Sequence, residues 1–211
     1  MKWEGLLSIV GSEPVFRTGF LAPGKETLAE MRMQLSRWVK TGRLIKLKKG
    51  LYTLAQPYRK VTPHPFLIAN AMKKASYVSM QSAMGHYEMI PEYVPAITSI
   101  TTQRPEQVET SLGHFVFQHV KKNWFHGYRQ IDLGSGQRAF IAIPEKALLD
   151  LVYLTPGADN YDFLCELRLQ NLEQLNIGVI RKLADKSDSV KVLRAAKLIA
   201  KLVKQETEKE L

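Results

Sequence analysis

Cysteine is almost absent from this sequence of 211 residues, in which Cys165 is the only one. A single thiol excludes an intramolecular disulfide framework and a zinc site built on several cysteines, and this usage fits a reducing cytoplasm. Long apolar runs are missing too, because no stretch approaches the roughly 18 uninterrupted apolar residues of a membrane span. The apolar segment at residues 6–10 is too short for a secretion signal. We therefore expect a soluble cytoplasmic protein with no membrane partner.

Catalytic signatures are also scarce. No glycine-rich loop precedes a Lys-Ser or Lys-Thr pair, and the Gly-Ser-Gly at residues 134–136 is not followed by the Asp-x-Asp of a nucleotidyltransferase. His114 and His119 are five positions apart on an expected strand, so their side chains point to opposite sides and cannot chelate one ion. We expect no catalytic residues, no metal site, no cofactor and no enzymatic activity.

Positive charge is what the sequence has in excess, and it is unevenly distributed. The chain carries 30 Lys and Arg against 20 Asp and Glu, a net charge of +10. Residues 1–60 hold 12 of the basic and 4 of the acidic side chains, a net +8, whereas the remaining residues hold 18 and 16, a net +2. A basic N-terminal quarter indicates a polyanionic partner such as nucleic acid.

The apolar pattern of residues 1–60 predicts a winged helix-turn-helix. A short helix at residues 3–10 is followed by a second one that Thr18 can cap, and then by the turn Pro23-Gly24. Apolar residues at positions 28, 31, 35, 38 and 39 form one stripe of a longer helix that ends at Thr41-Gly42. Residues 43–54 alternate around Gly50, which predicts a two-stranded ribbon with Lys46 and Lys48 on one face.

This arrangement predicts a set of side chains that contact double-stranded DNA. Arg, Gln and Ser on the exposed side of the longer helix can hydrogen-bond base edges, and lysines of the ribbon can lie on phosphates. The candidate residues are Lys25, Arg32, Gln34, Ser36, Arg37, Lys40, Arg43, Lys46, Lys48 and Lys49. Two alternatives stay open, because exposed basic side chains are often simply solvated and winged helices also bind proteins.

The remainder of the chain predicts a second, larger α+β domain. A proline-rich stretch at residues 56–65 places the boundary near residue 61, which divides the chain into domains 1–60 and 61–211. Helices are expected at residues 66–74 and 80–87, and strands at 96–101, 114–120 and 137–142. The chain is expected to turn helical after Pro144 and to contain helices only from Asn160 onward. The fold class is thus α+β, with a small antiparallel sheet and C-terminal helices behind the winged helix-turn-helix.

Three segments of the chain resemble AbiEi-family antitoxins of type IV toxin–antitoxin systems. They are LSRWVKTGRLIKLKKGLY at residues 35–52, ASYVSMQSA at residues 75–83 and AIPEKALLD at residues 142–150. The resemblance spans about residues 5–155, and it identifies the second segment as helical. It implies a transcriptional autorepressor that binds its own promoter and whose second domain counteracts a nucleotidyltransferase-like toxin. A monomer or weak dimer is expected, and cooperative binding to DNA stays open.

Two polar clusters of the second domain have two interpretations each. Lys146 and Asp150 are an i, i+4 pair, which predicts a surface salt bridge, and Glu145 is favoured by the positive start of its helix. The resemblance offers a structural or toxin-countering surface instead. The last helix has a basic stripe that is either solvated or in contact with DNA beside the operator. Its members are Lys191, Arg194, Lys197, Lys201 and Lys204.

Two functions from different classes follow. The first is a DNA-binding autorepressor with an antitoxin domain. The second is an enzyme that processes nucleic acids and uses the winged helix only to dock its substrate, which the missing carboxylate cluster argues against.

Overall fold

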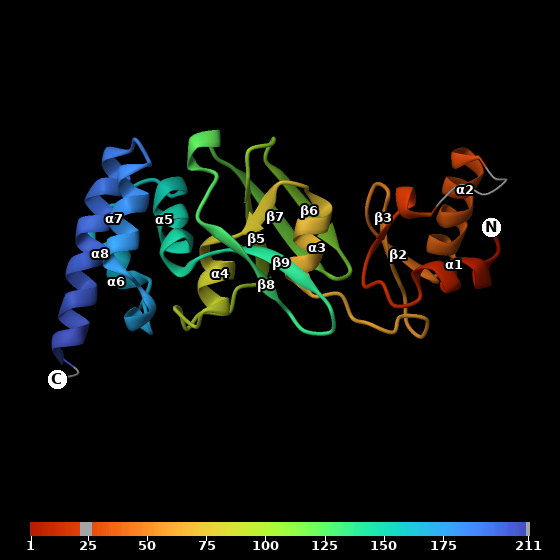
Figure 1. Ribbon diagram of the computed structural model, residues 1–211, viewed down its shortest axis with the longest axis horizontal. Coiled ribbons are helices and arrows are strands. Elements are labelled where there is room, and N and C mark those ends of the chain that lie inside the picture. The colour runs from red at the N-terminus through yellow and green to blue at the C-terminus, as the bar shows by residue number, and fades with distance from the viewer. Residues whose placement is uncertain (22–26, 210–211) are drawn as a thin grey trace.

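The computed structural model describes residues 1–21 and 27–209, with residues 207–209 described by their backbone only. The molecule is elongated, with the N-terminal elements at one end and the C-terminal helices at the other (Figure 1). The N-terminal elements are α1 (Trp3–Val10), β1 (Phe16–Arg17), the 3-10 helix η1 (Thr18–Phe20), α2 (Leu28–Lys40), β2 (Leu44–Lys48) and β3 (Leu51–Leu54). The predicted long helix and the basic ribbon are therefore confirmed.

The second unit begins at residue 65 and is built around a larger sheet. Its first half contains α3 (Pro65–Met72), β4 (Ser76–Val78), α4 (Met80–His86), β5 (Ala96–Thr101), β6 (Glu106–Thr110), β7 (Gly113–His119), η2 (Lys122–Trp124), β8 (Tyr128–Asp132) and β9 (Arg138–Ala142). Its second half contains α5 (Pro144–Leu154), α6 (Tyr161–Glu166), η3 (Leu172–Gln174), α7 (Ile177–Asp185) and α8 (Val190–Lys209). The expected helical C-terminal part is confirmed.

The two sheets differ in size and pairing. Strands β1, β3 and β2 form a small antiparallel sheet in that order. The second sheet has six strands in the order β6-β7-β5-β4-β9-β8, and its β5–β7 and β4–β9 pairs are parallel. The expectation of a small antiparallel sheet in the second domain is therefore wrong. Strand β6 is at the edge of the sheet and pairs antiparallel with β7. Strand β7 in turn runs parallel to β5.

The strands that sequence reasoning missed have weak periodic signals. Strands β6 and β8 are the edges of the sheet, and their side chains are mostly exposed or half-buried, so no apolar alternation marks them. Strand β4 has only three residues, all of them buried. The segment at residues 75–83, which resembles a helical signature, contains a short strand followed by the start of α4, and the helix expected at residues 80–87 is confirmed.

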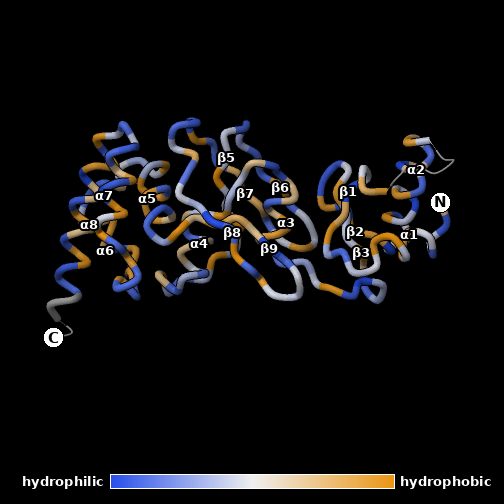
Figure 2. Tube along the Cα trace, viewed as in Figure 1, coloured by the Kyte–Doolittle hydropathy of each residue, from blue (hydrophilic) through white to orange (hydrophobic). Residues whose placement is uncertain are grey.

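The hairpin of β2 and β3 packs on both units. Leu44, Tyr52 and Leu54 belong to the buried core of the N-terminal unit, together with Leu35 of α2. Leu47 and Leu51 belong instead to the core of the second unit. Hydrophobic stretches of the chain lie in both units (Figure 2). The domain boundary near residue 61 stays a prediction. A fragment that begins at residue 61 would lack Leu47 and Leu51, which belong to the second core.

Lys146 and Asp150 are fully buried, so the predicted surface salt bridge is wrong. The Lys146 amine donates to Asp150 Oδ1, and its nitrogen lies 3.9 Å from the centre of the Trp124 ring. Burial lowers the pKa of the Lys146 amine, and the Asp150 carboxylate opposes that shift. The side of helix α5 that carries Lys146 and Asp150 faces the core. The i, i+4 spacing of the two charges in the sequence could not reveal this.

Asp150 is also the hydrogen-bond acceptor that joins three further elements. Trp124 Nε1 donates to Asp150 Oδ1 (2.7 Å), and the hydroxyls of Ser79 and Tyr77 donate to Oδ2 (2.7 and 3.0 Å). The buried Glu145 acts separately, because its Oε1 accepts from the backbone amide of Asn176 at the start of α7 (2.9 Å). Glu145, Lys146 and Asp150 therefore connect α5 to neighbouring elements.

A further observation concerns membranes. Among the described residues, no helix combines the length and the apolar character that crossing a bilayer requires.

Replacing Asp150 should therefore destabilise the second unit strongly. We expect Asp150→Asn to lower the free energy of unfolding by about 3–5 kcal/mol, because Lys146 would remain buried without its counter-charge. Urea denaturation followed by circular dichroism measures the change. Adding Lys146→Met to this variant should recover part of the loss, and the exposed Asp185→Asn is the control. An effect no larger than that of the control would contradict the assignment.

Candidate nucleic-acid interface

Helix α2 begins with a capping box. The Thr27 hydroxyl oxygen accepts from the Glu30 amide (3.2 Å), and Glu30 Oε2 accepts from the Thr27 amide (2.7 Å). These bonds hold the pKa of the Glu30 carboxyl below its usual value. Glu30 is thus engaged in starting the helix, which accounts for an acidic residue on an otherwise basic element.

The core determines which side of α2 faces outward. Met31, Leu35 and Trp38 are buried at helical spacing against the core of the N-terminal unit. Polar and basic side chains occupy the opposite side and are exposed. They are Arg32, Ser36, Arg37 and Lys40. Helix α2 therefore presents a basic row to the outside because its apolar row is anchored.

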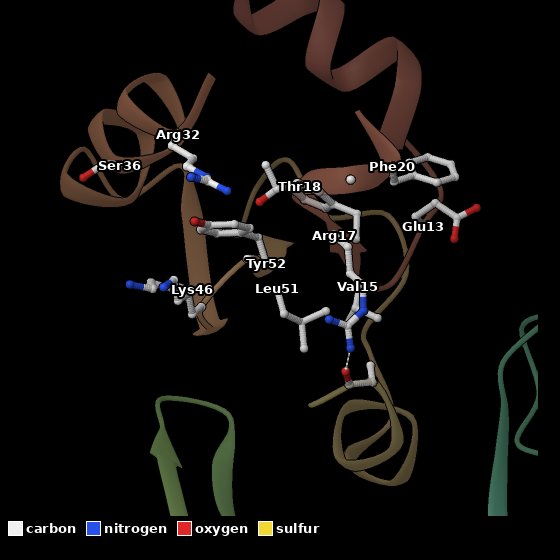
Figure 3. A pocket seen from close by; sticks show the side chains of 15 residues that line it. Glu13, Val15, Arg17, Thr18, Phe20, Arg32, Ser36, Lys46, Leu51 and Tyr52 are labelled. Carbon is white, nitrogen blue, oxygen red and sulfur yellow. Dashed lines mark hydrogen bonds between the residues drawn. The ribbon is translucent and has the colours of Figure 1, made fainter. Parts of the chain in front are cut away.

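A groove of about 1010 Å³ lies between α2, the hairpin and the segment that contains β1 and η1 (Figure 3). Its basic lining residues are Arg17, Arg32, Lys46 and Lys49, and Glu13 is its acidic one. Ser36, Thr18, Phe20 and Tyr52 line it as well. Among the described side chains, Arg32, Lys46 and Lys49 have no carboxylate partner, so their charge is available to an anionic ligand.

A β-bulge separates the lysines of the hairpin. Lys46 pairs with Tyr52, whereas Lys48 pairs with Leu51, so the register shifts between them. Lys46 consequently lines the groove, while Lys48 Nζ lies 2.6 Å from Glu106 Oε2 in the second unit. The expectation that Lys46 and Lys48 share one face of the ribbon is wrong.

Glu106 joins the hairpin to the second unit. Its Oε2 also lies 3.0 Å from Nζ of the buried Lys73, which donates to the carbonyl of Arg104 (2.6 Å). The bonds from Lys48 and Lys73 hold the pKa of the Glu106 carboxyl below its usual value. A guanidinium nitrogen of Arg17 donates to the Ala71 carbonyl in α3, the contact drawn in Figure 3. Two polar contacts therefore fix the N-terminal unit against the second.

The other candidate residues lie outside the groove or outside the description. Arg37 is exposed and one of its nitrogens lies 3.9 Å from Met33 Sδ, and Lys40 is exposed at the end of α2. Gln34 is half-buried, and the Arg43 guanidinium lies 5.3 Å from the centre of the Trp3 ring. Lys25 lies outside the described residues.

Several groove residues escaped sequence reasoning. Arg17 lies on a strand of two residues, too short for a periodic signal, and β1 becomes visible only through its pairing with β3. Thr18 and Phe20 reach the groove because the Thr18 amide donates to the Gly50 carbonyl (3.0 Å) at the tip of the hairpin. Gly50 has a φ of +75°, the left-handed conformation that such a turn favours. Tyr52 was visible only as part of the returning strand.

The groove can bind anions by charge and hydrogen bonds, and it contains a single carboxylate. Among the described residues, no group of three His, Cys, Asp or Glu is placed to hold a metal ion. Neither a scan against models of protein families nor a search of curated proteins finds a match to this chain.

The junction at Glu106 should contribute to stability at neutral pH. We expect Glu106→Gln to lower the free energy of unfolding by roughly 1–2 kcal/mol at pH 7, because Lys73 stays buried without its carboxylate. Since the pKa of Glu106 is lowered on folding, its contribution is complete above the ordinary glutamate pKa and disappears as the pH falls through the lowered value.

Denaturation curves of both proteins at neutral and acidic pH provide the measurement. Glu109→Gln, at an exposed position of the same strand, is the matched control. A difference between wild type and Glu106→Gln that grew toward acidic pH would contradict the role of the ionised carboxylate.

Proposed function

We propose that this protein binds double-stranded DNA through the groove between helix α2 and the β2–β3 hairpin. The observation that carries the proposal is the gathering of Arg17, Arg32, Lys46 and Lys49 around one concave surface with a single acidic side chain. Such a surface attracts the phosphate backbone through charge. The net +8 of residues 1–60 acts in the same direction.

The order of elements supports a winged helix-turn-helix as the DNA-binding unit. A helix, a short strand, a one-turn helix, a longer helix and a hairpin follow one another, and the hairpin pairs with the short strand. In helix-turn-helix proteins the last helix enters the major groove while neighbouring elements contact the backbone. Helix α2 has the exposed polar row that this role needs.

The proposal divides the contacts between bases and phosphates. Arg32, Ser36 and Arg37 lie on the outward side of α2, and their side chains are of the types that hydrogen-bond base edges in the major groove. Lys46 and Lys49 lie across the groove on the hairpin, where an ammonium can lie on a phosphate. Lys48 is bonded to Glu106, so we assign it a smaller part.

The biological role that we propose is that of a cytoplasmic autorepressor and antitoxin of the AbiEi type. Its support is the resemblance of residues 35–52, 75–83 and 142–150 to that family. In this proposal the N-terminal unit binds the promoter of its own gene, and the second unit counteracts a nucleotidyltransferase-like toxin.

DNA titrations at several salt concentrations test the first part. We expect a log–log salt slope of about −4 to −5 for roughly five phosphate contacts, measured by fluorescence anisotropy on the chain's own promoter. Lys46→Ala combined with Lys49→Ala should weaken all DNA equally and flatten the slope by about 2, whereas Lys48→Ala should change it less. Arg37→Ala should cost about 1–3 kcal/mol on the promoter but not on random DNA. A slope near zero for the wild type would refute the proposal.

A growth assay tests the antitoxin part with the full chain, because the hairpin packs on both units. We expect Arg32→Ala combined with Lys46→Ala and Lys49→Ala to abolish promoter binding but still protect cells that express the toxin encoded beside this gene. Expression from a foreign promoter separates protection from repression. Loss of protection by this folded variant would contradict the assignment of antitoxicity to the second unit.

A further inference from the structure

The C-terminal helices form a second concentration of positive charge. Residues 177–204 contain 8 basic and 2 acidic side chains, a net +6, and residues 205–211 add one lysine and three glutamates, whereas residues 61–176 sum to −2. Helices α7 and α8 lie at the end of the molecule opposite the N-terminal unit (Figure 1). The protein therefore has two basic ends, separated by a middle part without excess positive charge.

A shallow groove of about 330 Å³ lies between these two helices. Its apolar lining consists of the small Ala184, Ala196 and Ala200, of which the first two are buried, and of the exposed Leu193. Arg181 from α7 and Lys197 from α8 line the same groove, and Asp185 is its acidic residue. Lys201 is four residues beyond Lys197, so it continues the basic row along α8 by about 6 Å.

The structure distinguishes two groups among the cations of α7 and α8. Lys191 Nζ donates to the carbonyls of Thr155 (2.7 Å) and Tyr153 (3.2 Å), and Arg194 Nε donates to Asp159 Oδ2 (2.8 Å). These two cations attach α8 to its own unit. Arg181, Lys197 and Lys201 are exposed, and within the part of the chain that the structure describes they have no carboxylate partner.

We propose that the α7–α8 groove is a second nucleic-acid surface, which takes the phosphate backbone of duplex DNA without regard to sequence. Lysine ammonium groups contact phosphates as point charges and carry little sequence information. The groove residues include no aromatic side chain on which the bases of a single strand could stack. The groove between the two helices has small side chains on its lining and basic side chains beside them, so a phosphate backbone can approach it closely.

The proposal goes beyond the function of the N-terminal unit and does not depend on it. If both surfaces bind, one molecule contacts DNA at its two opposite ends (Figure 1).

The test uses a fluorescein-labelled duplex of random sequence and the full chain. To isolate the second surface, every protein carries Arg32→Ala, Lys46→Ala and Lys49→Ala, which disable the first groove. We expect residual binding, and we expect Arg181→Ala combined with Lys197→Ala and Lys201→Ala to weaken it about tenfold or more. The salt slope should flatten by about 3, since three phosphate contacts are lost.

The matched control removes the same charge elsewhere on the second unit. The control variant replaces three exposed lysines outside α7 and α8, namely Lys74→Ala, Lys121→Ala and Lys122→Ala. It should bind the duplex as tightly as its parent protein. Thermal melts establish that both variants fold, and the single charge reversal Lys197→Glu replaces the triple variant if that one does not.

Three results would overturn the proposal. The α7–α8 variant could bind the duplex as tightly as the control variant, or the control could lose as much affinity. The variant could also keep its DNA affinity and lose only binding to polyglutamate, which would identify an acidic protein as the partner. A failure of the first groove to bind promoter DNA leaves this test intact, because that groove is disabled throughout.

Discussion

The packing of one hairpin between two hydrophobic cores is the constraint on which the rest of this molecule depends. Leu44, Tyr52 and Leu54 anchor the hairpin to the N-terminal core, and Leu47 and Leu51 anchor it to the second core. Burial of each apolar side chain contributes on the order of 1.5–3 kcal/mol to the free energy of unfolding. Detaching the hairpin from either core would therefore be strongly unfavourable. The proposed DNA groove is therefore held at a fixed position on the second unit, and Glu106 and Arg17 add polar contacts to the same junction.

In the second unit, the buried hydrogen-bond cluster around Asp150 joins several elements. A carboxylate that accepts from Lys146, Trp124, Ser79 and Tyr77 ties α5 to the strand–helix segment around β4 and to η2. Replacing such a cluster by apolar residues often costs little stability, whereas removing one partner costs much. Removal of the Asp150 carboxylate alone would therefore destabilise these contacts, and α5 also contacts the start of α7 through Glu145.

The tertiary structure determines where the excess positive charge of the chain lies. Two basic ends of net +8 and +6 lie at opposite ends of an elongated molecule. The hairpin joins the two units, so the two proposed surfaces lie at the opposite ends of one molecule.

Sequence alone determined the elements whose signals are local: the amphipathic α2 with its apolar row, the ribbon around Gly50, three strands of the second sheet, and the concentration of charge before residue 61. It also identified Arg32, Ser36, Lys46 and Lys49, which the structure brings to one groove. Tertiary structure decided what depends on pairing and burial. The bulge between Lys46 and Lys48 turns one lysine to the groove and the other to Glu106, and β1 exists only because β3 pairs with it. Lys146 and Asp150 have the spacing of a surface pair, yet the side of α5 that carries them is turned inward. Periodicity along a chain records which residues share a side, but contacts with distant segments decide whether that side meets water or protein.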